Sequence, residues 1–88
     1  MEKMLNESEW LIQVLIDRLH NIAVKNNEEF NYNINIRRLV DKLEYYFVVR
    51  ETESELIFVE GSGNNLSDAV LEATASVDDA CKRWKYKE

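Results

Sequence analysis

This sequence lacks proline altogether and contains only two glycines, Gly61 and Gly63. Proline and glycine mark turns and flexible linkers, so their scarcity argues against long irregular segments between folded units. With 88 residues, 45% of them hydrophobic, the chain is long enough for one core and too short for two. We therefore expect a single compact domain spanning residues 1–88.

Cysteine and histidine each occur once, as Cys81 and His20. A lone cysteine rules out an internal disulfide and fits a reducing cytoplasm. One cysteine and one histidine cannot complete a His/Cys zinc site within one chain, and no pattern positions a nucleophile beside the histidine. The GSGNN segment at residues 61–65 lacks the lysine and threonine of a Walker loop, so turn formation is favoured over phosphate binding. We expect no cofactor, no bound metal and no catalytic residues, in a protein that is not an enzyme.

Long hydrophobic runs are also missing. Asp17 and Arg18 interrupt the apolar N-terminal run before it reaches the length of a membrane span. The N-terminus has neither a basic start nor a small-residue cleavage site, so the pattern predicts no signal peptide. We expect a cytoplasmic protein without membrane contacts.

Basic residues are absent from Glu51 to Asp79, a stretch that holds eight acids. Phosphates would meet carboxylates there, so direct binding of nucleic acid is disfavoured. Such a surface could instead occupy the basic groove of a nucleic-acid-handling protein and inhibit it. The alternative is that the carboxylates only keep a small protein soluble. Seven of them are candidate protein-binding residues: Glu51, Glu53, Glu55, Glu60, Asp68, Glu72 and Asp79.

A first helix is predicted from about Ser8 to Val24, with Ser8 as its N-cap. Its apolar residues fall on one broad stripe at helical spacing: Leu11, Ile12, Leu15, Ile16, Leu19, Ile22 and Ala23. Trp10 and Val14 fall on another side of this helix. Trp10 either folds over the helix end as a peripheral core residue or serves, with Val14, as an exposed anchor for a protein partner.

The segment FNYNINIRRLVDKLE, residues 30–44, fits two structures. Its first half alternates apolar residues with asparagines, which is typical of a strand. From Ile36 onward the apolar residues instead follow helical spacing, and the composition suits a helix. We expect a helix from about Ile34 to Glu44 after an extended segment. The alternative is a third strand over Phe30–Ile36.

The following segment YYFVVRETESELIFVE predicts two strands, Tyr45–Arg50 and Glu55–Glu60, joined by a polar turn. Both arms are continuously apolar, and successive strand side chains point to opposite faces. We therefore expect helices to cover both faces of the sheet. A turn over residues 61–65 then leads into a last helix capped by Ser67. The buried side of this helix is predicted to hold Val70, Ala73, Val77, Ala80, Cys81 and Trp84.

The predicted fold class is α+β: an N-terminal helix, a second helix or third strand, a two-stranded antiparallel hairpin and a C-terminal helix. A hairpin covered on both faces still has two open edges, and open edges invite pairing with another chain. We therefore expect a homodimer or a higher homo-oligomer, joined by strand edges or through the face that holds Trp10 and Val14.

The stretches YNINIRRLVDKLE, YYFVVRE and VEGSGNNLSDAVLEA resemble small phage proteins with an α/β/α "ABA sandwich" domain. The resemblance covers roughly Tyr32 to Ala80. The step GNNLSDAVLEA is also similar to the strand-to-helix step of HicB-type antitoxins, although the aromatic, glycine-rich strand signature of those proteins is missing here. The phage resemblance implies origin and architecture, and it offers no catalytic residues.

Together these features predict a phage or prophage protein that acts by binding a host protein. Its most concrete form is an acidic inhibitor of a host defence or nucleic-acid-handling protein in the cytoplasm of a bacterial cell. Two other hypotheses are an oligomer that sequesters a small ligand such as a nucleotide, and an antitoxin-like partner of a toxin.

Overall fold

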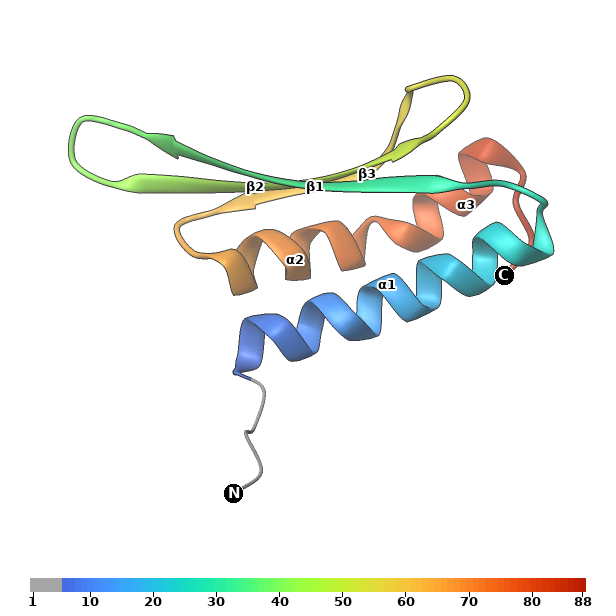
Figure 1. The fold of residues 1–88 in the computed structure, drawn as a ribbon, viewed down its shortest axis with the longest axis horizontal. Helices are drawn as coiled ribbons and strands as arrows, with labels where there is room; N and C mark the ends of the chain where they lie inside the picture. Colours follow the sequence, from blue (N-terminus) through green and yellow to red (C-terminus); the bar gives the residue numbers. More distant parts are fainter. Residues whose placement is uncertain (1–5) are drawn as a thin grey trace.

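The computed structural model describes residues 6–88. They form one helix, three strands and two further helices: α1 (Glu7–Lys25), β1 (Phe30–Arg38), β2 (Leu43–Glu51), β3 (Ile57–Gly63), α2 (Leu66–Ala75) and α3 (Val77–Trp84). The strands make one antiparallel sheet in the order β1-β2-β3. The three helices lie on the same face of this sheet (Figure 1), and their buried residues join one core cluster. The α+β class is confirmed, whereas the expectation of helices on both faces is wrong.

Helix α1 has the extent that its apolar stripe predicts, but its cap is different. Asn6, not Ser8, is the N-cap, and its Oδ1 accepts a hydrogen bond of 2.9 Å from the backbone N–H of Glu9. Leu15, Leu19 and other residues of the stripe are buried in the core. None of the helices within residues 6–88 is long and apolar enough to cross a membrane.

Residues 30–38 form strand β1, so the helix expected over Ile34–Glu44 is wrong and the alternative of a third strand is confirmed. The period-two pattern prevails because β2 offers a partner for every residue of the segment, from Phe30 opposite Glu51 to Arg38 opposite Leu43. The helical spacing was misleading because it included Val40, which lies fully exposed in the turn between the two strands.

The predicted hairpin is confirmed as β2 and β3, with longer arms than expected. Phe47 and Val49 point into the core, as alternation requires. Val48 points to the opposite face, which no helix of residues 6–88 covers, yet it is only 1% exposed. Its cross-strand neighbours there are Asn33 and Glu60, so longer polar side chains surround it. Because neighbouring side chains enclose it, Val48 needs no second layer of helices.

Gly61 and Gly63 belong to strand β3, so the turn expected at residues 61–65 begins later than predicted. Both glycines face α2, which packs directly against the strand. A Cβ built on Gly61 would lie 2.0 Å from the carbonyl oxygen of Ala69. The glycines therefore serve close approach of helix and sheet rather than turn formation.

The last helix is interrupted at Ser76, giving α2 and α3. Thr74 donates its hydroxyl to the carbonyl of Val70, and Ser76 donates to that of Glu72. Such side-chain bonds to the preceding turn bend helices. The cap is Asn65 instead of Ser67, since its Oδ1 accepts from the N–H of Asp68 at 2.9 Å. The predicted buried side is confirmed for Val70, Ala73, Val77, Ala80 and Cys81, and Trp84 packs against it half-buried.

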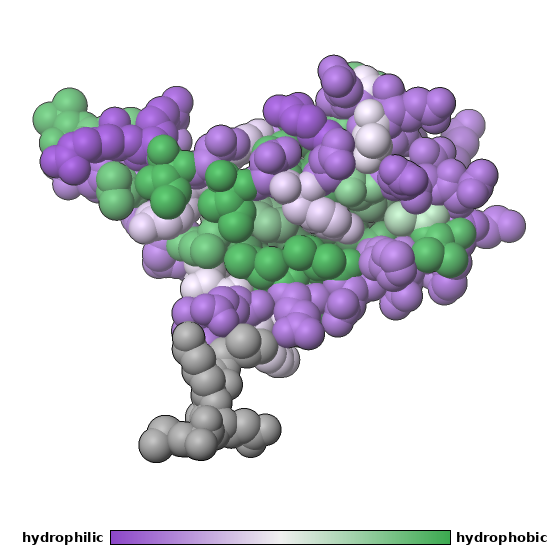
Figure 2. All heavy atoms as spheres, in the orientation of Figure 1, coloured by the Kyte–Doolittle hydropathy of each residue, from purple (hydrophilic) through white to green (hydrophobic). Residues whose placement is uncertain are grey.

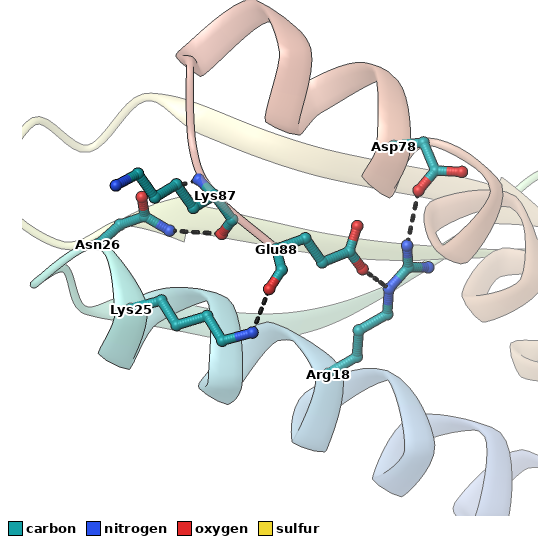
Figure 3. Close-up of polar contacts among 6 residues, drawn as sticks. All are labelled: Arg18, Lys25, Asn26, Asp78, Lys87 and Glu88. Atoms are coloured by element: carbon teal, nitrogen blue, oxygen red, sulfur yellow. Dashed lines mark hydrogen bonds and ion pairs between the residues drawn. The ribbon is translucent and has the colours of Figure 1, made fainter.

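The C-terminal segment is tied to α1 by a group of polar contacts (Figure 3). Arg18 pairs with Asp78 at 2.7 Å and with the side chain of Glu88. The Asn26 amide donates to the carbonyl of Lys87 at 2.8 Å and accepts from its N–H at 2.9 Å. These contacts hold the chain end against the helix that precedes the sheet, and they fix α1 relative to α3.

Candidate protein-binding surface

Trp10 and Val14, the two anchors predicted on α1, both lie on the surface. Trp10 is 56% exposed and Val14 is 46% exposed, one helical turn apart. Trp10 is thus outside the buried core. Because exposed tryptophan is enriched in interaction hot spots, this pair is a candidate contact for a partner.

The seven candidate carboxylates do not form one surface. Glu51, Glu53 and Glu55 lie at the turn between β2 and β3. Glu60 lies on the open face of the sheet, where it accepts a hydrogen bond from the Tyr46 hydroxyl. The others are exposed residues of α2 and α3: Asp68, which accepts a hydrogen bond from the Asn65 side chain, Glu72, and Asp79, which pairs with Arg83.

One local acidic cluster does form, at the end of the sheet near the β2–β3 turn. The loop after α1 brings Glu28 and Glu29 beside Glu53, around a hollow that Val24 also lines. Partial desolvation, followed by the charges of Glu51 and Glu53, raises the pKa of Glu28. The acidic stretch from Glu51 to Asp79 does not reveal this cluster, because Glu28 lies far from that stretch along the chain. The pairing of Phe30 with Glu51 brings Glu28 close to it.

We expect Glu28→Gln to raise the melting temperature at pH 7 and to leave it nearly unchanged near pH 3. A carboxyl whose pKa is raised by folding destabilises the folded state when ionised, so its stability contribution falls as pH rises. Thermal unfolding followed by circular dichroism checks this. Glu72→Gln, on the exposed side of α2, is the matched control and is expected to show no such pH-dependent gain. An equal change at both pH values for Glu28→Gln would contradict the cluster.

The outer edge of β1 has no strand partner within the described chain. Two hydrogen bonds that flank β1 show which of its residues direct their backbone N–H and C=O groups to the open edge, a property that we call its backbone polarity. They run from the Thr52 N–H to the Glu29 oxygen at 2.9 Å and from the Leu39 N–H to the Lys42 oxygen at 2.8 Å. These bonds fix the odd-numbered residues of β1 as those that bond to β2. Antiparallel pairing alternates, so the even-numbered residues direct their N–H and C=O groups to the open edge. They are Phe30, Tyr32, Ile34, Ile36 and Arg38.

The same even-numbered residues place apolar side chains on the helix side of the sheet. Ile34 is 46% exposed and Ile36 is 60% exposed, because the β1–β2 hairpin projects beyond the helices (Figure 1). Leu43, opposite Arg38 on β2, is 39% exposed. Figure 2 shows hydrophobic side chains in a band between the sheet and α1 that continues onto this hairpin. The edge of β1 and this apolar band form one surface, which we call the β1 edge surface.

The other edge of the sheet, formed by β3, is less suited to pairing with another strand. Strand β3 has seven residues against nine in β1, and an irregularity between Val49 and Arg50 displaces its register. It also carries the charged Glu60 and two glycines. Bulges, charge and short length are the features that protect edges from pairing. The β1 edge has none of them between Phe30 and Ile36.

No protein-family model, no curated protein and no solved structure matches this chain.

The open face of the sheet is polar. It presents Asn31, Asn33 and Asn35 from β1, and Arg37 pairs with Glu44 across the hairpin. Burial and the hydrogen bond to Glu60 raise the pKa of Tyr46 to about 12. No group of His, Cys, Asp and Glu residues within 6–88 is arranged to hold a metal ion. His20 is exposed on α1, whereas Cys81 is buried and burial raises the pKa of its thiol.

Sequence reasoning missed Ile34 and Ile36 as surface residues because it placed both in a helix, with Ile36 as part of the apolar spacing of that helix. Their alternation with asparagines was the available signal: it indicates a strand with one polar face and one apolar face. What alternation alone does not reveal is that this strand lies at the edge of the sheet, since strand order depends on the whole fold.

Proposed function

We propose that this chain is a non-enzymatic protein-binding module that adds the open edge of β1 to a strand of another chain. The observation that supports it is the unpaired backbone of β1 beside the exposed side chains of Ile34 and Ile36. In strand addition, main-chain hydrogen bonds supply affinity and side-chain contacts supply specificity. The β1 edge surface offers both within one nine-residue strand.

The energetics of this mode are adequate for a specific complex. Fully burying an isoleucine is worth roughly 1.5–3 kcal/mol, and about half of that remains to be gained at two half-exposed positions. Each new backbone hydrogen bond adds about 1 kcal/mol net. Ordering costs are small because the strand is already formed, which favours binding without refolding.

Replacing both isoleucines of the edge with lysine, as Ile34→Lys/Ile36→Lys, is expected to abolish binding. Lysine on an edge strand is a natural barrier to pairing. The matched control is Val40→Lys/Leu56→Lys, which adds the same charge at exposed positions away from the edge. Affinity capture from the lysate of the organism that encodes the chain, followed by titration, is expected to show at least tenfold weaker binding, about 1.4 kcal/mol, for the edge variant only. Equal retention by both variants would contradict the proposal.

A second candidate function is the acidic inhibition of a basic host protein, in keeping with the resemblance to small phage proteins. The cluster around Glu28, Glu29 and Glu53 favours it, because close carboxylates suit a basic groove. Salt distinguishes the two functions. A complex held by the acidic cluster is expected to weaken steeply as ionic strength rises, whereas one held by the β1 edge surface is expected to weaken less steeply. If the acidic cluster holds the complex, Glu28→Gln is expected to lower the affinity, and Ile34→Lys/Ile36→Lys is not.

A further inference from the structure

We infer that the occupant of the β1 edge is a second copy of this chain, paired antiparallel so that Ile34 lies opposite Ile34 of the other copy. This inference rests on the proposed function and names its partner. Two β1 strands would then join the sheets of both copies into one continuous sheet. Three independent features of β1 support it: its backbone polarity, its charge distribution and its apolar side chains.

Backbone polarity limits the possible registers. Only the even-numbered residues of β1 direct their N–H and C=O groups outward, so even-numbered residues must face each other across the new pair. A two-fold axis through Ile34 uses the whole of Phe30–Arg38 in both copies. Tyr32 then faces Ile36, and Phe30 faces Arg38. Any other register that pairs even-numbered residues shortens the overlap of the two β1 strands, so it forms fewer backbone hydrogen bonds.

The charges at the two ends of β1 are complementary only in the antiparallel direction. Glu28, Glu29 and Glu53 lie beside its beginning, and Arg37, which is paired with Glu44, and Arg38 form its end. Among residues 6–88 Arg38 has no ion-pair partner. Antiparallel pairing brings the basic end of each copy to the acidic end of the other, twice. A parallel arrangement would place like charges together, which is unfavourable.

The apolar side chains match as well. Ile34 would face its own counterpart, and Ile36 would face Tyr32, so each exposed isoleucine of one copy would lie against an isoleucine or a tyrosine of the other. Aromatic and β-branched pairs across strands stabilise a sheet. On the opposite face, Asn33 would face Asn35 and Asn31 would face Arg37, so no like charges meet there. A self-complementary strip of this kind is the pattern of a two-fold interface.

Cysteine cross-linking tests the register directly. In this arrangement the two Cα atoms at position 34 are about 5.5 Å apart, within the range of a disulfide. The two at position 36 are about 14 Å apart, since four residues of strand separate them. Oxidised Ile34→Cys is therefore expected to run as a covalent dimer on a non-reducing gel, while Ile36→Cys, its matched control, is expected to stay monomeric. The native Cys81 is buried, so the unmodified chain is not expected to cross-link.

Light scattering of the unmodified chain, over a concentration series, is the companion measurement. We expect the mass of a dimer for the unmodified chain and of a monomer for Ile34→Lys/Ile36→Lys. A dimer by mass with cross-linking at position 36 and not 34 would overturn the register. A monomer throughout, without cross-linking at position 34, would overturn the inference. The proposed function would survive that result if the edge variant still lost a captured protein, and would fail with it if the edge variant changed neither assembly nor capture.

Discussion

Gly61→Ala is expected to destabilise the fold by roughly 2–4 kcal/mol, the upper range of overpacking effects. The added Cβ would lie 2.0 Å from the Ala69 carbonyl oxygen and 2.6 Å from the Ala73 nitrogen. Both are backbone atoms of α2, so no side chain can rotate away to make room. The helix must move outward, and that movement opens the core around Ala69 and Ala73, which are fully buried.

Urea unfolding followed by circular dichroism measures this change. Ser62→Ala is the matched control, because Ser62 is the next residue of β3 and lies on the open face opposite Tyr46. Its replacement is expected to alter the free energy of unfolding by no more than about 0.5 kcal/mol. A Gly61→Ala variant as stable as Ser62→Ala would show that α2 does not pack against β3 at this distance.

The same glycine shows where sequence reasoning reached its limit. Gly61 and Gly63 were assigned to a turn, the commonest use of glycine between a strand and a helix. Their actual use depends on the small residues of α2, Ala69 and Ala73, which bring that helix close to the strand. The buried side of the last helix was predicted with Ala73 but without Ala69, which is also fully buried. The residues of the sheet that they face follow only from the three-dimensional pairing.

The first helix was predictable from its single helical periodicity, and the β2–β3 hairpin was predictable from two runs of aromatic and β-branched residues joined by a polar turn. Segment 30–44 has two overlapping periodicities, and tertiary pairing decides between them: a complete set of partners on β2 outweighs helical propensity. The break at Ser76 was missed for another reason. The apolar pattern runs through it without interruption, while the hydroxyl bonds of Thr74 and Ser76 bend the chain.

The candidate site was predictable only in part. Exposure of Trp10 and Val14 follows from their place off the apolar stripe of α1. The acidic block did not predict a surface, because strand alternation and two helices direct its carboxylates to different sides of the molecule. The β1 edge surface could not be predicted, since it depends on which strand lies at the edge of the sheet and how far the hairpin extends beyond the helices.

Phe58→Ala is expected to have the largest effect on stability, a loss of about 3–5 kcal/mol. Phe58 is 1% exposed and lies at the centre of an aromatic cluster. Its ring centroid is 4.8 Å from that of Phe30, 5.7 Å from that of Trp84 and 5.5 Å from that of Tyr86. Removing it would leave a cavity where three elements meet, and each aromatic pair adds about 1 kcal/mol beyond its buried area.

A register irregularity in β3 explains how Phe58 and its neighbour Val59 can both be buried in the core. Val49 pairs with Val59 and Arg50 pairs with Ile57, so Phe58 is the extra residue of a bulge. The bulge turns both Phe58 and Val59 toward the helices, and both are buried in the core. A regular strand would direct one of them to the open face. The same irregularity thus supplies a core residue and makes the β3 edge unsuitable for pairing.

Chemical unfolding of Phe58→Ala and of Phe58→Leu distinguishes the cost of the lost volume from the cost of the lost ring shape. Leucine keeps most of the buried volume, so its loss is expected to be about half that of alanine. Near-ultraviolet circular dichroism of the folded variants should lose intensity in both, since Trp84 and Tyr86 lose their neighbouring ring. If Phe58→Ala costs less than about 1 kcal/mol, the rings do not form the packed cluster and the C-terminal segment is not anchored by it. A loss in the expected range, with β1 still competent to pair, would show that the fold can lose stability at Phe58 without losing the binding edge, although Phe30 belongs to both.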